Sequence, residues 1–194
     1  MKTQMQLAYE ILSLELEMFH NMQNCGSGAA DLCSGECFRR VRECQLGAWN
    51  HAMLESYFDD ICCARAEGRN LLCQQYAWLL LSERPAEYGW LEGQLEKPSM
   101  EKRWLIDWIS RARESFWNTS DEMRGEKYPA IWAVDAENEK AGWKICLHSE
   151  LMMYSVETLR RYAAYLEKLT NERKSMEHMI LRRWRDCFAA IQAE

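Results

Sequence analysis

Apolar residues recur every three or four positions along most of this chain, and polar residues fill the positions between them. Residues 3–24 give the first clear example, because one broad arc is apolar while a narrow opposite stripe is polar. Such spacing is typical of an amphipathic α-helix, in which residues three and four positions apart share a face. The segment therefore predicts a helix that buries one side. Its central apolar stripe is Leu7, Ile11, Leu14, Met18 and Met22.

Turn and capping residues divide the rest of the chain into further helical segments. Gly68 suits the left-handed position after a helix end, and Asn70 can cap the helix that follows, which we expect to stop before Pro85. Ser155 can cap another helix near the end of the chain. The predicted segments after the first are 32 to about 67 with a bend at Gly35 or Gly47, 70 to about 82, 99–117, 156–169 and 176–191.

The periodicity fails between residues 118 and 146, where polar stretches indicate loops. Two short apolar pieces in or beside this region, residues 130–134 and 143–147, have the composition of strands that pair as a hairpin. The one-sided helical segments must bury their apolar stripes against neighbours. The sequence therefore predicts an all-α fold, a single-domain helical bundle or array of about six to eight helices over residues 1–194, with one short β-hairpin near 130–147 as an option.

Composition narrows the classes of function. The chain has 194 residues and a formal net charge of -6, without a block of basic residues. Nucleic-acid binding draws most of its affinity from clustered cations, so we expect no nucleic-acid partner. The longest strongly apolar run, residues 76–81, is too short to cross a bilayer, and the first residues lack the apolar stretch of an export signal. We expect a soluble, cytoplasmic protein with no membrane partner.

Nine cysteines bear on the compartment and on metal binding. An odd number without an export signal indicates free thiols, which usually pack as small hydrophobic side chains. A second interpretation stays open, because Cys33, Cys37 and Cys44 share one helical stripe and Cys25 lies in the preceding loop. Four sulfurs in such a group could hold zinc or an iron–sulfur cluster. Their spacing matches neither a zinc ribbon nor a ferredoxin motif, so we favour the packing stripe.

Glu17 and His20 have the Glu-x-x-His spacing that carboxylate-bridged metal bundles use, because three residues place both ligands on one helical face. Such a site needs a second copy, which none of the other histidines provides. Asp60 is a candidate companion carboxylate on a later helix. Because Glu17 and His20 belong to the polar stripe of their helix, we favour solvent exposure over metal binding for both.

Glu150 lies in a segment, residues 145–155, in which most of the nearby residues are apolar. A helix through it would bury much of the carboxylate, and a buried carboxylate needs a cation or several hydrogen-bond donors. We expect Arg69 as a candidate partner. We favour the interpretation that Glu150 is a buried polar group that fixes the register of its helix. The alternative is that Glu150 lies in a pocket and acts there as a general acid or base or as a ligand-binding carboxylate.

Several short strings between about residues 56 and 160 resemble those of a family of bacterial proteins that is classed as a domain of unknown function. The resemblance implies a bacterial, cytoplasmic and mainly helical protein, and it supplies no reaction, cofactor or catalytic residue. It directs attention to the turn at Arg69 and Asn70 and to the segment from Glu150 to Tyr154. The strings are Ser56-Tyr57 with Asp59-Asp60, residues 67–72 with Tyr76-Ala77, Lys127-Tyr128-Pro129, and Glu150-Leu151 with Tyr154-Ser155 and Thr158-Leu159.

Two classes of function stay open. The first is a helical binding or accessory protein that recognises a small molecule or a partner chain through an aromatic-lined pocket, with Arg69, Asn70, Glu150 and Tyr154 as polar anchors. The alternative is a helical enzyme in which buried carboxylates and a histidine move protons or hold a metal, with Glu150 and Tyr154 as candidate catalytic residues. The sequence contains no nucleotide-binding loop, nucleophile elbow or zinc-protease motif, so no cofactor is implied, and a homodimer stays open.

Overall fold

The structure is a computed structural model, and it describes residues 2–24, 34–119 and 139–192. The described residues form nine α-helices and one short 3₁₀ helix, and they contain no strand. The fold is all-α, as predicted. The elements are α1 (Gln4–Asn24), α2 (Gly35–Gly47), α3 (His51–Ala66), α4 (Leu71–Glu83), α5 (Pro85–Tyr88), η2 (Gly89–Gly93), α6 (Met100–Thr119), α7 (Glu139–Met153), α8 (Val156–Asn171) and α9 (Met176–Gln192).

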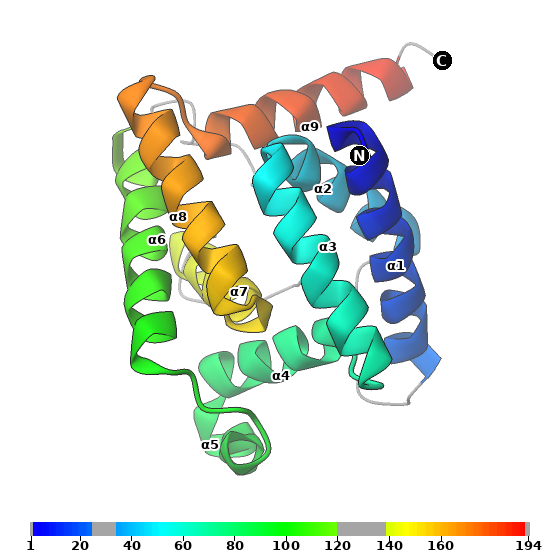
Figure 1. The fold of residues 1–194 in the computed structure, drawn as a ribbon, viewed down its shortest axis with the longest axis vertical. Helices are drawn as coiled ribbons and strands as arrows, with labels where there is room; N and C mark the ends of the chain where they lie inside the picture. Colours follow the sequence, from blue (N-terminus) through cyan, green and yellow to red (C-terminus); the bar gives the residue numbers. More distant parts are fainter. Residues whose placement is uncertain (1, 25–33, 120–138, 193–194) are drawn as a thin grey trace.

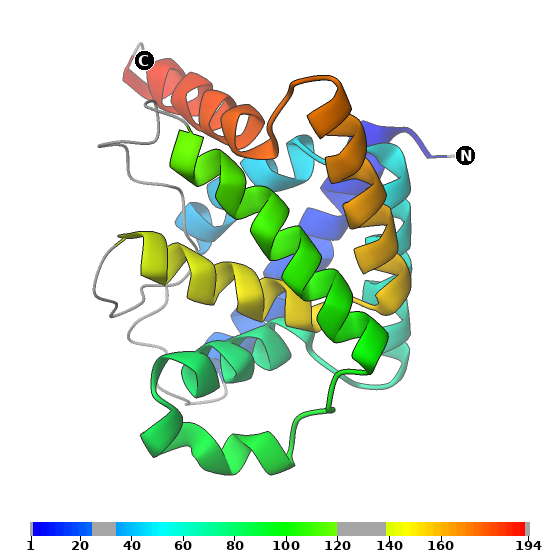
Figure 2. The same ribbon diagram turned by 90° about the vertical axis from the view of Figure 1, so that its left-hand side faces the viewer.

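The helices pack in crossed pairs around a shared core. Helix α1 lies against α2, α3 and α4, while α8 joins the two sides of the molecule by packing on both α3 and α6 (Figure 1). Helix α7 runs between α4 and α6, and the α5–η2 arm extends beyond them (Figure 2). None of the helices in the described part of the chain combines the length and hydropathy that a membrane crossing requires.

Local sequence signals account for most helix ends. The Asn70 side chain accepts hydrogen bonds from the backbone N–H groups of Leu72 and Cys73 at 3.0 and 3.1 Å, and the Ser155 hydroxyl accepts one from Thr158 at 3.1 Å. Gly68 has φ +70°, which is the left-handed conformation that ends a helix and that glycine adopts at low cost. These three predictions are therefore confirmed.

Two sequence expectations differ from the structure. The long segment expected to bend near Gly47 is two helices, because Asn50 leaves helical geometry and its side chain caps α3 by accepting from the Met53 N–H at 2.9 Å. The hairpin is wrong in its second half, and the loop expected over 118–146 is wrong from residue 139 onward, because α7 begins there and includes residues 143–147. Its first half, residues 130–134, lies outside the described residues.

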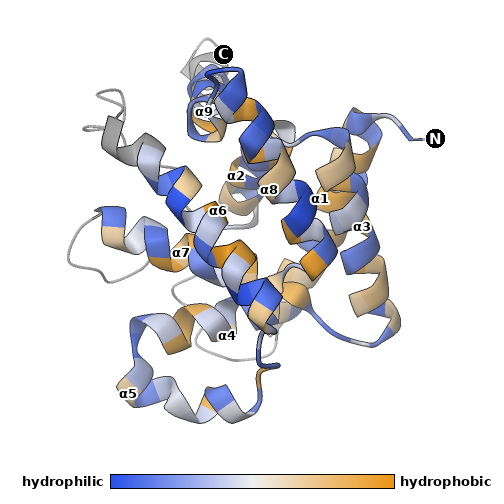
Figure 3. Cartoon of the chain, turned by 60° about the vertical axis from the view of Figure 1, so that its left-hand side comes forward, coloured by the Kyte–Doolittle hydropathy of each residue, from blue (hydrophilic) through white to orange (hydrophobic). Residues whose placement is uncertain are grey.

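The centre of the core is aromatic and joins α3 and α8 to the α2–α3 and α7–α8 connections. Trp49, in the connection between α2 and α3, has ring centroids 5.6, 5.6 and 5.8 Å from those of Tyr57, Tyr154 and Tyr162. The Tyr57 and Tyr154 rings meet edge to face with centroids 4.9 Å apart. Each such pair contributes about 0.5–1.5 kcal/mol beyond the burial of its area. Hydrophilic residues cover much of the outer faces of the helices in Figure 3, although Trp90 and Trp104 are exposed as well.

Asp60 joins α3 to the start of α8. Its Oδ2 accepts from the Ser155 N–H at 2.9 Å and from the Thr158 hydroxyl at 2.8 Å, and the Ser56 and Thr158 hydroxyls lie 2.8 Å apart. The carboxylate therefore satisfies a backbone N–H at a helix start, where the helix dipole also favours negative charge.

We expect Asp60→Ala to lower the free energy of unfolding by about 1–2 kcal/mol, because the backbone N–H of Ser155 and the hydroxyl of Thr158 lose their acceptor. Urea denaturation measures this change. The matched control is Asp59→Ala at the exposed neighbouring carboxylate, which should leave the midpoint nearly unchanged. Equal losses in the two variants would contradict the role of Asp60.

Candidate functional site

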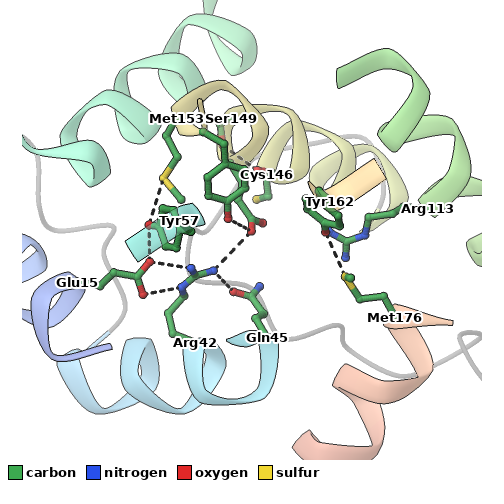
Figure 4. Close-up of polar contacts among 12 residues, drawn as sticks. Glu15, Arg42, Gln45, Tyr57, Arg113, Cys146, Ser149, Met153, Tyr162 and Met176 are labelled. Atoms are coloured by element: carbon green, nitrogen blue, oxygen red, sulfur yellow. Dashed lines mark hydrogen bonds and ion pairs between the residues drawn. The ribbon is translucent and has the colours of Figure 1, made fainter. Parts of the chain in front are cut away.

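A buried guanidinium, that of Arg42 on α2, lies between two buried carboxylates. Arg42 Nε donates to Glu15 Oε2 at 2.9 Å and Nη2 donates to Glu15 Oε1 at 2.7 Å, which is a bidentate pair. Arg42 Nη1 donates to Gln45 at 2.6 Å and lies 3.5 Å from Oε1 of Glu150 on α7. Figure 4 shows this guanidinium surrounded by its partners. One side chain thus ties α1, α2 and α7 together.

Two buried tyrosines complete this cluster. The Tyr57 hydroxyl donates to Glu15 Oε1 at 2.7 Å, and the Tyr154 hydroxyl donates to Glu150 Oε1 at 2.6 Å. Since one guanidinium faces two carboxylates, these neutral donors help to stabilise the remaining negative charge. We call Glu15, Arg42, Tyr57, Glu150 and Tyr154 the buried ion cluster.

The protonation states within the buried ion cluster follow from burial and charge. Burial raises the pKa of Tyr57 well above its ordinary value, and the adjacent Glu15 charge adds to this. Burial and the charge of Glu150 raise the pKa of Tyr154 in the same way. Burial is the largest single influence on Arg42 and would lower its pKa, but the charge and hydrogen bonds of Glu15 together with Tyr154 and Tyr57 outweigh it, so the pKa is raised. Both tyrosines are therefore neutral donors and Arg42 is a cation at physiological pH.

A second buried ion pair joins α6 to α9. Arg113 pairs with Glu177, and its Nη1 donates to the Tyr162 hydroxyl at 2.9 Å (Figure 4). The Ser175 hydroxyl donates to Glu177 Oε2 at 3.2 Å. The Arg113 guanidinium also lies over the Trp143 ring, 5.6 Å from its centroid, in a cation–π contact. The pair therefore fixes a tryptophan of α7 as well as the start of α9.

The described residues form a groove between α6 and α7, bounded by the end of α4 and by the arm that follows it. Its volume is about 960 Å³. At its far end the Lys102 ammonium donates to the Met152 carbonyl at 2.8 Å and ties the two helices together. We call this concavity the α6–α7 groove. Its apolar lining is Trp78, Leu81, Pro85, Pro98, Ile106, Trp143, Leu147 and Met152, and its polar lining is Glu92, Lys97, Arg103, Asp107, Ser110, Arg111, Glu114, Lys144 and His148.

Ion pairs hold part of the groove's polar rim. Arg111 pairs with Asp107 at 2.8 Å, one helical turn away on α6. Lys144 of α7 reaches across to Glu114 of α6 at 2.8 Å, and hydrogen bonds from this lysine and from Lys140 lower the pKa of Glu114. On α7, His148 is neutral near pH 7, because desolvation lowers its pKa. The rim therefore offers paired charges beside a neutral imidazole.

The structure separates the residues that the sequence predicted as anchors of one pocket. Arg69 is exposed and pairs with Glu67 at 2.5 Å, so the expectation that it partners Glu150 is wrong and Arg42 takes that place. Asn70 caps α4 and its amide donates to the Met18 carbonyl at 2.9 Å. Glu150 and Tyr154 belong to the buried ion cluster. None of the four lines the α6–α7 groove.

The candidate metal ligands also lie apart. Glu17 pairs with Arg65 at 3.1 Å on the exposed side of α1, His20 is exposed, and Asp60 caps α8. Within residues 2–24, 34–119 and 139–192, no three His, Cys, Asp or Glu side chains come together as a metal site. Of the cysteine stripe, Cys37 and Cys44 are free thiols, whereas Cys25 and Cys33 lie outside the described residues.

Glu15 and Arg42 were missed by the sequence analysis, although a signal for both was present. Glu15 falls in the apolar arc of its helix, four positions after Ile11 and four before Phe19. Arg42 follows Phe38 by four positions in the same way. A charged residue at a core position of an amphipathic helix predicts a buried ion pair, because a lone buried charge is too costly.

We expect Arg42→Met to lower the free energy of unfolding by about 3–5 kcal/mol, because it leaves Glu15 and Glu150 buried without their cation. Urea denaturation at neutral pH measures the loss. The matched control is Arg40→Met on the same helix, whose ion pair with Glu36 is exposed and should matter little. A loss for Arg42→Met no greater than for the control would contradict the central role of this guanidinium.

The raised pKa values of Tyr57 and Tyr154 also predict a loss of stability at alkaline pH. Their stabilising contribution is fully present below the unfolded-state pKa of about 10, and it decreases above this pH because the unfolded chain releases the protons first. Absorbance near 295 nm should therefore show that the folded chain ionises fewer of its eight tyrosines at about pH 11 than the urea-unfolded chain does. Identical titration curves for the two states would refute the prediction.

Comparison with known proteins places this architecture in a family. The model of a family described as "Protein of unknown function (DUF4125)" matches residues 5–186. No curated protein and no solved structure matches the chain. Because the match spans α1 to α8 and most of α9, and so includes both buried ion pairs and the groove, the chain belongs to this protein family of unknown function.

Proposed function

We propose that this protein is a binding protein that holds a small molecule with an apolar body in the α6–α7 groove. The observation that carries the proposal is a groove of about 960 Å³ whose lining includes two tryptophans and four aliphatic or methionine side chains. Ligand sites in proteins combine such apolar walls with a few polar groups that orient the ligand. The neutral imidazole of His148 and the hydroxyl of Ser110 are groups of that kind.

Preorganisation of the groove supports the proposal. Helix α7 forms one wall, and the buried ion cluster fixes it from behind through Glu150 and Tyr154. Trp143 is fixed by the guanidinium of Arg113, and Lys102 joins α6 to the end of α7. A site whose walls are fixed before binding loses less conformational entropy when the ligand binds. In this proposal Glu150 and Tyr154 position a wall and do not touch the ligand.

The test uses 8-anilinonaphthalene-1-sulfonate, a fluorescent aromatic anion, as the probe. We expect saturable binding to the wild-type protein and a loss of affinity of at least about tenfold in Ser110→Trp, because the larger side chain would occupy the groove. The matched control is Ser13→Trp at an exposed position of α1, which should bind the probe as the wild type does.

Circular dichroism melting of the three proteins separates a blocked groove from a misfolded chain. Ser110→Trp should retain the helical signal and unfold cooperatively. The proposal fails if the folded wild type shows no saturable binding, or if Ser110→Trp binds the probe with unchanged affinity.

A further inference from the structure

Most charges along the α6–α7 groove are matched by partners within the protein. Arg111 and Asp107, one helical turn apart on α6, are joined by two contacts, one of 3.1 Å from Nε and one of 2.8 Å from Nη2. Lys144 of α7 pairs with Glu114 at 2.8 Å. Because these side chains are engaged with each other, they are poorly placed to decide which charge a ligand should carry.

Two cations at the other end of the groove differ from these. Lys97, in the connection between η2 and α6, and Arg103, near the start of α6, both line the groove and are exposed. Neither forms an ion pair with any of the described residues. The carboxylate one turn after Arg103, that of Asp107, is paired with Arg111 instead. This end of the groove therefore has two cations whose charge no salt bridge neutralises.

The guanidinium of Arg103 is held in place by a neutral group. Its Nε donates to the carbonyl of Pro98 at 3.1 Å, and Pro98 itself lines the groove. Within the described part of the chain its two Nη atoms donate to no residue. Two Nη groups of one guanidinium form a planar edge of donors that matches two oxygens of a carboxylate, sulfonate or phosphate.

The acidic residues of the lining offset these cations only in part. Glu92 of η2 lines the groove and makes no ion pair with the described residues, so it opposes one of the two cations. The lining as a whole retains a formal surplus of one positive charge, although the chain carries a net charge of -6. The basic lining residues are Lys97, Arg103, Arg111 and Lys144, and the acidic ones are Glu92, Asp107 and Glu114.

We infer that the ligand of the α6–α7 groove is a small amphipathic acid. Its anionic group binds the Nη edge of Arg103 and the ammonium of Lys97, while its apolar body lies against the tryptophan and aliphatic side chains of the groove. This inference rests on the proposed function and adds to it the chemical class of the ligand.

The experiment compares two probes that share their rings and differ in charge. They are 8-anilinonaphthalene-1-sulfonate and N-phenyl-1-naphthylamine, which lacks the sulfonate. Arg103→Gln should weaken binding of the sulfonate probe by about fivefold or more and that of the neutral probe by less than about twofold. Raising the NaCl concentration from about 0.05 to about 0.5 M should weaken binding of the sulfonate probe alone, because salt screens exposed charges.

Matched variants and competitors assign the effect. Arg182→Gln makes the same charge change at an exposed position of α9, at the opposite end of the molecule from the α5–η2 arm, and should leave both affinities unchanged (Figure 1). Glu92→Gln should strengthen binding of the sulfonate probe, because it removes the opposing carboxylate. The competitor 1-naphthaleneacetate should displace the neutral probe, whereas acetate at the same concentration and ionic strength should not.

The outcomes separate this inference from the proposed function. If neither probe binds saturably, or if Ser110→Trp leaves both affinities unchanged, the proposed function fails and the inference fails with it. If both probes bind and Ser110→Trp weakens both, the groove is a binding site. An equal effect of Arg103→Gln on the two probes, or an equal effect of Arg182→Gln on the sulfonate probe, would then overturn the anionic ligand alone. Equal displacement by acetate and 1-naphthaleneacetate would overturn the amphipathic one.

Discussion

The fold depends on one buried cation, the guanidinium of Arg42. It holds Glu15 of α1 with two parallel hydrogen bonds and faces Glu150 of α7, while its own helix is α2. Removing such charges from water costs several kcal/mol each, so the arrangement is stable only when every partner is in place. Tyr57 and Tyr154 meet this requirement by donating to the two carboxylates. Apolar stripes alone would pack in several helix registers. The hydrogen bonds and ion pairs of the buried ion cluster, in contrast, form together in only one register.

Helix α7 connects the buried ion cluster to the α6–α7 groove. Its Glu150 contacts Arg42 in the cluster, while His148 lines the groove from another side of the same helix. The second ion pair has a similar position, because Arg113 binds Glu177 and also covers the Trp143 ring. The charged groups of both buried ion pairs thus contact only other residues of the protein. They help to position the walls of the α6–α7 groove without lining it.

The features that could be predicted from the sequence are those that neighbouring residues determine. The caps at Asn70 and Ser155 and the left-handed Gly68 each depend on a few neighbouring residues and were confirmed, and periodicity located the longer helices except α7. The partner of Glu150 was not predictable in this way, because Arg69 and Arg42 are both distant in sequence and only the crossing of α2 and α7 selects Arg42. The groove was missed for a related reason, since only the packing of α4, α6 and α7 brings its lining residues, which lie between positions 78 and 152, to one opening.

The buried ion cluster and the α6–α7 groove differ in whether their side chains can accept a proton near neutral pH. In the buried ion cluster, both oxygens of Glu15 accept hydrogen bonds, and the raised pKa values keep Tyr57 and Tyr154 protonated. In the groove, the lowered pKa of His148 leaves its imidazole neutral, with a nitrogen that can accept a proton or a hydrogen bond. The cluster therefore has the character of a fixed scaffold, and in the proposed function the polar contacts with a ligand are made in the groove.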